Sequence, residues 1–246
     1  GYSRVMSQPL VATRNLKTKG TFGTPNFELS FFDDAGKPLS PWHDLALFPK
    51  NDTKGVQTVN MVVEIPKGRM EKLEVNKELP HNPIKQDTKK GKPRYYSYGV
   101  PFFNYGMLPQ TWENPKVKDK AGHAGDGDPL DVIEIGSEQL PTGSIVEVKV
   151  LGVLELIDQG EVDYKIIVVK SDDEMAEGLD TPKDIDEDIV ARLVDWLKMY
   201  KTAEGKAKNK LTSDTISGPS TAMKVIRETH KYWKKQKFTA TGQVAK

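Results

Sequence analysis

The 246-residue chain contains no cysteine, which excludes disulfide bonds and thiolate chemistry and fits a reducing compartment. It also lacks any run of about 18 apolar residues, so the sequence predicts no transmembrane helix. Net charge is scarce as well, because 36 Lys and Arg oppose 35 Asp and Glu, which leaves +1. A general attraction to nucleic acid or to an anionic membrane is therefore not expected, and anion binding must come from local clusters.

Composition along the chain suggests three parts. Residues 1–24 are mixed and basic without a clear period, which predicts an N-terminal arm. Residues 25–235 are expected to form a single domain, and the polar residues 236–246 a flexible C-terminal tail. The chain begins with Gly1 rather than Met, which leaves open that a targeting segment or a preceding domain is missing.

Apolar periodicity predicts a strand at 58–65, ended by a proline, and a hairpin whose strands are 144–157 and 164–170. Apolar residues near a 3.6-residue period then predict helices over 184–200 and 219–235. Strands precede helices in this order, which indicates a β-rich α+β fold with helices packed outside a β core.

The most informative stretch is GDGDPLD, residues 125–131, which places three carboxylates within six positions. Three anions this close repel one another unless cations lie among them. Asp126 and Asp128 are two positions apart, so in extended chain they point the same way. Pro129 has a restricted φ and disfavours helix at the residue before it. Together with Asp131, these side chains offer the oxygen ligands that hard divalent cations prefer.

Other interpretations of this stretch must be weighed. Gly and Asp are ordinary loop residues, and carboxylates near turns are usually solvated or bonded to a nearby backbone group. An EF-hand is excluded, because Pro129 and Leu130 occupy its fourth and fifth positions and Asp131 stands where the loop needs glycine. The phosphate-binding pattern G-x-x-x-x-G-K-[ST] is absent, and the four histidines are scattered and expected to be ordinary polar residues.

Acid–base pairs two residues apart accompany the carboxylate cluster. Lys72 with Glu74, and Asp163 with Lys165, would each share one face of a strand. Further candidates are Glu64, Arg94, Tyr105, Asp158, Tyr200 and Lys201. Carboxylates bind Mg²⁺, which also binds phosphate oxygens, and cationic or phenolic groups bind the remaining oxygens. Because one Zn²⁺ already lowers the pKa of a bound water from about 15.7 to about 7, such metals would supply hydroxide without a nucleophilic side chain.

Six segments in chain order resemble the soluble family I inorganic pyrophosphatases, in their eukaryotic form. They are NMVVEIPKGRMEKLE (60–74), NPIKQDTKKGKPRYY (82–96), NYGMLPQTWE (104–113), GDGDPLDV (125–132), IDQGEVDYK (157–165) and the pair Tyr200–Lys201. The resemblance covers nearly the whole chain and is specific because all six motifs agree. It implies a five-stranded, OB-like β-barrel with flanking helices, and hydrolysis of pyrophosphate to two orthophosphates by a metal-activated water held between divalent cations.

The resemblance also implies a role for each matched residue. Asp128 would accept the proton of the attacking water, and Asp131 would bridge the first two metals. The metal ligands would be Asp126, Asp131, Asp158 and Asp163, with Glu64 and Glu74 orienting metal-bound waters. Phosphate oxygens would be bound by Lys72, Arg94, Tyr105, Lys165, Tyr200 and Lys201, of which the first three also act in catalysis. In many members a further active-site tyrosine stands four residues before Tyr105, where this chain has Pro101.

Mg²⁺ is the cofactor that the resemblance implies, with Mn²⁺, Zn²⁺ or Co²⁺ as substitutes, and short polyphosphates become substrates with Zn²⁺ or Co²⁺. The expected partners are pyrophosphate and a second copy of the chain in a homo-oligomer, a dimer being favoured, with no nucleic acid and no membrane. The expected location is the cytoplasm, with the lumen of an acidocalcisome, mitochondrion or plastid as the alternative. A nucleic-acid-binding OB-fold module and a catalytically dead, metal-binding relative are the rival hypotheses.

Overall fold

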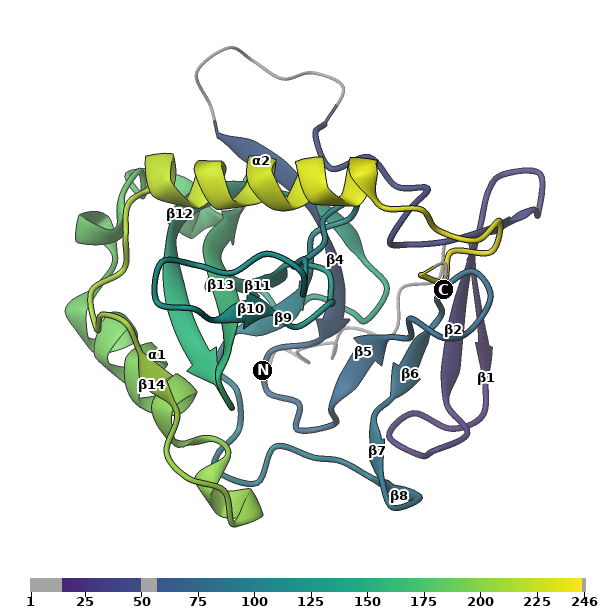
Figure 1. Cartoon of the computed structure of the whole chain (residues 1–246), viewed down its shortest axis with the longest axis horizontal. Coiled ribbons are helices and arrows are strands. Elements are labelled where there is room, and N and C mark those ends of the chain that lie inside the picture. Colours follow the sequence, from purple (N-terminus) through teal and green to yellow (C-terminus); the bar gives the residue numbers. More distant parts are fainter. Residues whose placement is uncertain (1–14, 50–56, 245–246) are drawn as a thin grey trace, which may run out of the picture.

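The protein is described by a computed structural model that covers residues 15–49 and 57–244. Its centre is a ring of five strands (Figure 1). β4 pairs with β9, β9 with β11, β11 in parallel with β13, β13 with β12, and β12 closes the ring on β4. The bounds are β4 Thr58–Ile65, β9 Asn104–Met107, β11 Asp131–Glu134, β12 Ile145–Asp158 and β13 Glu161–Lys170. The closed five-stranded sheet agrees with the expected fold class.

A second, smaller sheet lies beside the ring in the order β1-β2-β6-β5, with β3 on β2, and two further strands form a separate hairpin. The bounds of the second sheet are β1 Leu16–Lys19, β2 Glu28–Phe32, β3 Pro38–Leu39, β5 Leu73–Val75 and β6 Ile84–Gln86, and those of the hairpin are β7 Thr88–Lys89 and β8 Lys92–Pro93. Two short strands extend the sheet of the ring: β10 Ala124–Gly125 pairs with β13, and β14 Lys210–Leu211 pairs with β12. Within the expected N-terminal arm at 1–24, the described residues contain β1, which pairs with β2 along its whole length. Residues 1–14 lie outside the described part.

Two helices cover the ring from outside (Figure 1). α1 spans Glu187–Met199, later than the predicted start, because the Asp186 side chain accepts a hydrogen bond from the Asp188 amide and caps the helix there. α2 spans Pro219–Lys235, as predicted, with the proline in its first turn, and it packs on β12. Over the described residues, neither helix is both long and apolar enough to cross a bilayer.

The predicted hairpin is confirmed, with a tighter turn than expected. β12 and β13 are joined by Gln159 and Gly160 alone, and both have positive φ, 52° and 93°. Two-residue turns of this kind match the twist of the paired strands. In this register Asp163 lies opposite Leu156 and Asp158 opposite Glu161, so both aspartates share one face of the sheet.

The segment expected to be a flexible C-terminal tail makes contacts with other elements in its described part. Within 236–244, the Phe238 ring lies 5.3 Å from the buried Trp42 ring, and the Gly242 carbonyl accepts a hydrogen bond from His43 Nε2 at 2.8 Å. Phe238 and Val244 also form a β-bridge. This segment is therefore packed, because the Phe238 ring contacts the rings of Trp42 and His43. The polar residues around Phe238 in the sequence give no sign of this contact.

Candidate active site

One cavity of about 490 Å³ opens beside the ring of strands. All thirteen residues predicted to bind metal, phosphate or the attacking water line its wall. They come from β4, β5 and the residue before it, β9, β11, β12, β13, the 125–131 loop, the residue after β8 and the residues that follow α1. The sequence therefore predicted which side chains share this cavity, while their individual roles stay predictions.

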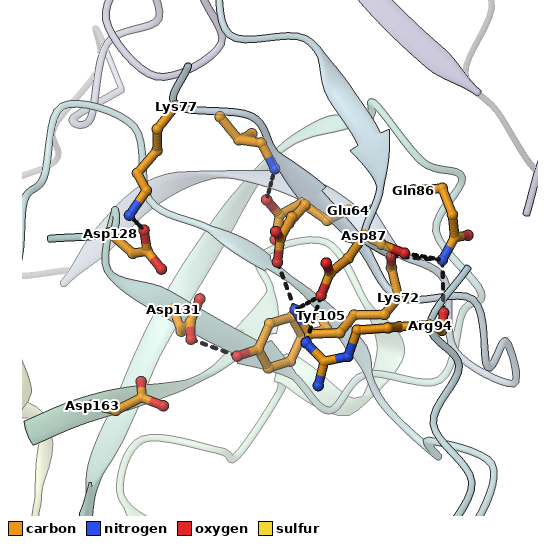
Figure 2. Close-up of polar contacts among 12 residues, drawn as sticks. Glu64, Lys72, Lys77, Gln86, Asp87, Arg94, Tyr105, Asp128, Asp131 and Asp163 are labelled. Carbon is orange, nitrogen blue, oxygen red and sulfur yellow. Dashed lines mark hydrogen bonds and ion pairs between the residues drawn. The ribbon is translucent and has the colours of Figure 1, made fainter. Parts of the chain in front are cut away.

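Lys165 is the central cation of the site. It is only 3% exposed, and its Nζ donates to Asp131 Oδ2 at 2.5 Å, to Asp163 Oδ1 at 2.6 Å and to the Tyr105 hydroxyl at 2.9 Å. Tyr105 in turn donates its hydroxyl proton to Asp131 Oδ2 at 2.6 Å (Figure 2). Burial alone would lower the pKa of Lys165, but Asp131 and Asp163 hold it well above its usual value.

Two carboxylates on the acidic side of the cavity, Asp126 and Asp163, line its wall and meet a third that does not. Oxygens of Glu113, Asp126 and Asp163 all lie within 4.8 Å of one another. Glu113 is a residue that the sequence analysis missed, although it ends the NYGMLPQTWE segment. It is 3% exposed, and its Oε1 accepts from the Tyr164 amide at 3.1 Å. Its Oε2 is buried without a hydrogen-bond partner among the described residues.

This acidic side fits a hard divalent cation. Burial, together with neighbouring carboxylates, raises the pKa of Asp126 to about 8 and that of Asp163 to about 7, although Lys165 opposes the second shift. Oδ1 of Asp158 is also buried without a partner within the described ranges. A group of carboxylates that is costly to ionise, with oxygens left unsatisfied, is stabilised when a cation enters. These residues therefore match the donor set that Mg²⁺ or a similar ion requires.

We expect the metal-free protein to lose stability as pH rises from mildly acidic to mildly alkaline. Because the pKa values of Asp126 and Asp163 are raised on folding, the folded state binds more protons than the unfolded state above about pH 4. This contribution is complete below the unfolded pKa and disappears as pH rises through the folded pKa values. Urea unfolding in a chelator at several pH values measures the decline, and saturating Mg²⁺ should remove most of it. A free energy of unfolding that does not change with pH in the metal-free protein would contradict the raised pKa values of Asp126 and Asp163.

On the cationic side of the cavity, Lys72, Arg94 and Lys201 each pair with at least one carboxylate. Lys72 Nζ donates to Glu74 Oε2 at 2.5 Å and to Asp87 Oδ2 at 2.9 Å, and Arg94 Nη1 donates to the same Asp87 oxygen at 2.6 Å (Figure 2). Lys201 pairs with Asp158. Asp87 was not predicted, although it lies in the QDTKKGK motif, since nothing in its spacing shows that it joins two cations.

Two further residues that the sequence analysis missed support this side. The buried Gln86 amide donates to the backbone carbonyls of Lys72 at 3.1 Å and Arg94 at 2.6 Å, so it joins the two chain segments that carry these cations. Lys77 pairs with Asp128, the predicted proton acceptor, and lines the same cavity. Glu64, predicted to orient metal-bound water, accepts at Oε1 from the Val75 amide at 2.7 Å and so also holds the edge of β5.

Pro101, at the position where the resemblance implied a further tyrosine, is buried and does not line the cavity. Its carbonyl accepts a hydrogen bond from the Gly68 amide at 2.8 Å. Tyr98 does not substitute for the missing phenol, because its hydroxyl donates to Asp195 on α1 at 2.7 Å, away from the site. Tyr96 does line the cavity, and burial raises its pKa to about 12.

Comparison with known proteins agrees with this geometry. A family profile described as inorganic pyrophosphatase matches residues 61–234. An inorganic pyrophosphatase of Drosophila melanogaster is 40% identical over 224 residues, 87% of this chain and 65% of its own length. The soluble inorganic pyrophosphatase 6, chloroplastic, of Arabidopsis thaliana is 39% identical over 89% of this chain and 73% of its own. The chain thus spans about two thirds to three quarters of these relatives.

Solved structures show the same likeness. The type I inorganic pyrophosphatase from Toxoplasma gondii superposes with a TM-score of 0.84 at 38% identity, over 89% of this chain and 98% of that one. An N-terminally truncated vacuolar soluble pyrophosphatase from Trypanosoma cruzi, solved in complex with PPi, gives 0.84 at 34% identity, over 94% and 95% of the two chains. With the family profile, the relatives and the shared fold in agreement, this chain belongs to the inorganic pyrophosphatase family.

Proposed function

We propose that this protein hydrolyses inorganic pyrophosphate to two orthophosphates with the help of divalent cations. The observation that carries the proposal is that carboxylates, cations and phenols line the same cavity. A substrate with four ionisable oxygens needs cations on both sides, and this cavity offers metal ligands on one side and Lys and Arg on the other. The relative solved with PPi supports the choice of substrate.

Asp126, Asp131, Asp158 and Asp163 would hold the metal ions, with Glu64 and Glu74 orienting their waters. When bound, such ions supply a water of lowered pKa and neutralise charge on the phosphate oxygens. Their arrival would also change the partners of the lysines. Lys165 and Lys201 now contact Asp131, Asp163 and Asp158, so carboxylates that turn to a cation leave these ammonium groups available for phosphate.

Asp128 would take the proton from the attacking water. Its side chain is 46% exposed to the cavity and the solvent, whereas its neighbours Asp126 and Asp131 face buried cations and carboxylates. Lys72, Arg94 and Tyr105 would bind the phosphoryl oxygens as charge moves onto the leaving phosphate, with Lys165, Tyr200 and Lys201 completing the contacts. Charge-assisted hydrogen bonds of this kind are stronger than neutral ones, which suits a highly charged leaving group.

We also propose the metal ion, the domain extent, the oligomeric state and the location of the protein. Mg²⁺ is the preferred ion, and Zn²⁺ or Co²⁺ would extend activity to short polyphosphates. Residues 25–235 would act as one pyrophosphatase domain, in a homodimer located in the cytoplasm. Chloroplastic and vacuolar relatives keep an organelle as the alternative location.

A phosphate-release assay tests the function. Purified protein should release orthophosphate from pyrophosphate with Mg²⁺ and lose this activity in excess chelator, because the carboxylate cluster then lacks its counter-charge. The same assay with tripolyphosphate, under Mg²⁺ and under Zn²⁺, tests the wider substrate range. Absence of release under every metal, together with salt-dependent binding of single-stranded DNA, would favour the OB-fold module instead.

A further inference from the structure

A carboxylate outside the predicted set contacts Arg94 at the edge of the cavity. Arg94 Nη2 donates to both Oε1 and Oε2 of Glu204 at 3.0 Å, while Nη1 donates to Asp87 Oδ2 at 2.6 Å. The side chains of Glu204 and Arg94 are only 17% and 22% exposed. Both terminal nitrogens of the guanidinium are therefore held by carboxylates, one 7 residues away in the chain and the other 110 residues away.

Glu204 is tied to the end of α1. It closes a short 3₁₀ turn, Thr202–Glu204, and its amide donates to the Lys201 carbonyl at 3.0 Å. Gly205 ends the turn in a left-handed conformation, with φ of 76°. Because the turn is short and closed by hydrogen bonds, the Glu204 carboxylate has a defined position relative to Lys201. The ion pair thus connects two predicted phosphate-binding residues from separate elements.

The remaining donors of Arg94 are suited to a substrate. A guanidinium has five N–H groups in a rigid plane, so fixing two of its nitrogens also fixes the direction of the others. Within residues 15–49 and 57–244, its Nε makes no hydrogen bond that would compete with a ligand. Arg94 lines the cavity, whereas Glu204 lies behind it, on the side of the β7–β8 hairpin.

We propose that Glu204 is a positioning residue that orients the Arg94 guanidinium toward a phosphate oxygen of the substrate. The inference rests on the proposed function, in which Arg94 binds a phosphate oxygen of pyrophosphate. An alternative role, in which the ion pair only stabilises the fold, predicts a different result. A stabilising pair would affect the unfolding midpoint, whereas a positioning pair affects phosphate affinity through Arg94 alone.

Glu204→Gln keeps the size of the side chain and removes its charge. We expect the KM for pyrophosphate to rise about tenfold while kcat changes less than about threefold, since a charge-assisted hydrogen bond is lost in binding. Calorimetry with inorganic phosphate, in the presence of Mg²⁺, should show a similar loss of affinity without relying on turnover. Glu204→Asp keeps the charge and should fall between the wild type and Glu204→Gln, which keeps the test open if the Gln variant folds poorly.

Asp214→Asn is the control, because Asp214 pairs with Lys198 near the end of α1 but lines neither of the cavities that Arg94 lines. It should leave KM and phosphate affinity unchanged. In an Arg94→Lys background, Glu204→Gln should change phosphate affinity less than about twofold, since the guanidinium that Glu204 orients is no longer present. An unchanged KM in Glu204→Gln, or an equal effect in both backgrounds, would overturn the positioning role. A wild-type protein without turnover would overturn the proposed function instead, while the phosphate calorimetry still decides on Glu204.

Discussion

Asp128→Asn should lower kcat for pyrophosphate by about 100-fold or more, because a positioned general base typically contributes 10²–10⁴-fold. An amide has nearly the shape of the carboxylate but does not accept a proton at neutral pH. The KM should change little, since Asp128 is not expected to bind phosphate. Steady-state kinetics with Mg²⁺ measures both constants, and calorimetric titration of Mg²⁺ shows whether metal affinity is kept.

The control for this variant is Asp180→Asn. Asp180 pairs with Lys149 at 2.6 Å, much as Asp128 pairs with Lys77, but it lies on the surface outside the cavity. We expect wild-type kinetics from the control. A kcat of Asp128→Asn within about threefold of the wild type would remove Asp128 from the role of general base. A large loss of Mg²⁺ affinity would instead show that Asp128 is a metal ligand.

Lys165→Met should destabilise the metal-free protein by about 3 kcal/mol, because removing one partner of a buried ion pair leaves uncompensated charge. Asp131 and Asp163 both lose their nearest cation, and Asp163 is itself buried. Saturating Mg²⁺ should then stabilise the variant more than the wild type, since in the variant the two carboxylates bind the metal without breaking an ion pair to Lys165. Urea unfolding, with chelator and with Mg²⁺, gives both free energies.

Lys170→Met, on the same strand β13, serves as the comparison. Lys170 pairs with Glu138 and Asp172, whose side chains are exposed, and such surface pairs contribute about 1 kcal/mol or less. A loss below about 1 kcal/mol in Lys165→Met, equal to that of the control, would mean that the buried cation contributes little to stability. Equal stabilisation of variant and wild type by Mg²⁺ would contradict the exchange of partners between lysine and metal.

Glycine at one position shows how closely the strands pack around the site. Gly106 lies between β4 and β11, and a Cβ there would come within 2.0 Å of the Val62 carbonyl oxygen. This close approach lets β9 pair on both sides while its neighbour Tyr105 reaches Asp131. The NYG motif therefore combines a catalytic candidate with the backbone space that positions it.

The sequence by itself determined the helices and strands that depend on residue patterns within one short segment. Strand β4, the β12–β13 hairpin and helix α2 follow from apolar periodicity and turn residues, which depend only on neighbours in sequence. The thirteen candidate site residues could be named because each lies in one of the six segments that resemble the pyrophosphatase family. Even the pairs Lys72–Glu74 and Asp163–Lys165 follow from the two-residue period of a strand, and both form ion pairs in the structure.

Only the tertiary structure decided which side chains from different segments of the chain contact one another. Glu204 contacts Arg94 across 110 residues of chain, and Glu113 meets Asp163 on β13. Asp87 lies closer in sequence to its partners Lys72 and Arg94, but it joins them only because the chain folds back at β6 and the β7–β8 hairpin. No local period marks any of the three. The same reason explains β1 and the C-terminal segment, whose short and polar sequences order by pairing and packing against other elements. Burial, which sets the carboxylate pKa values and the cost of unpaired charge, is likewise a property of the folded chain and not of its sequence pattern.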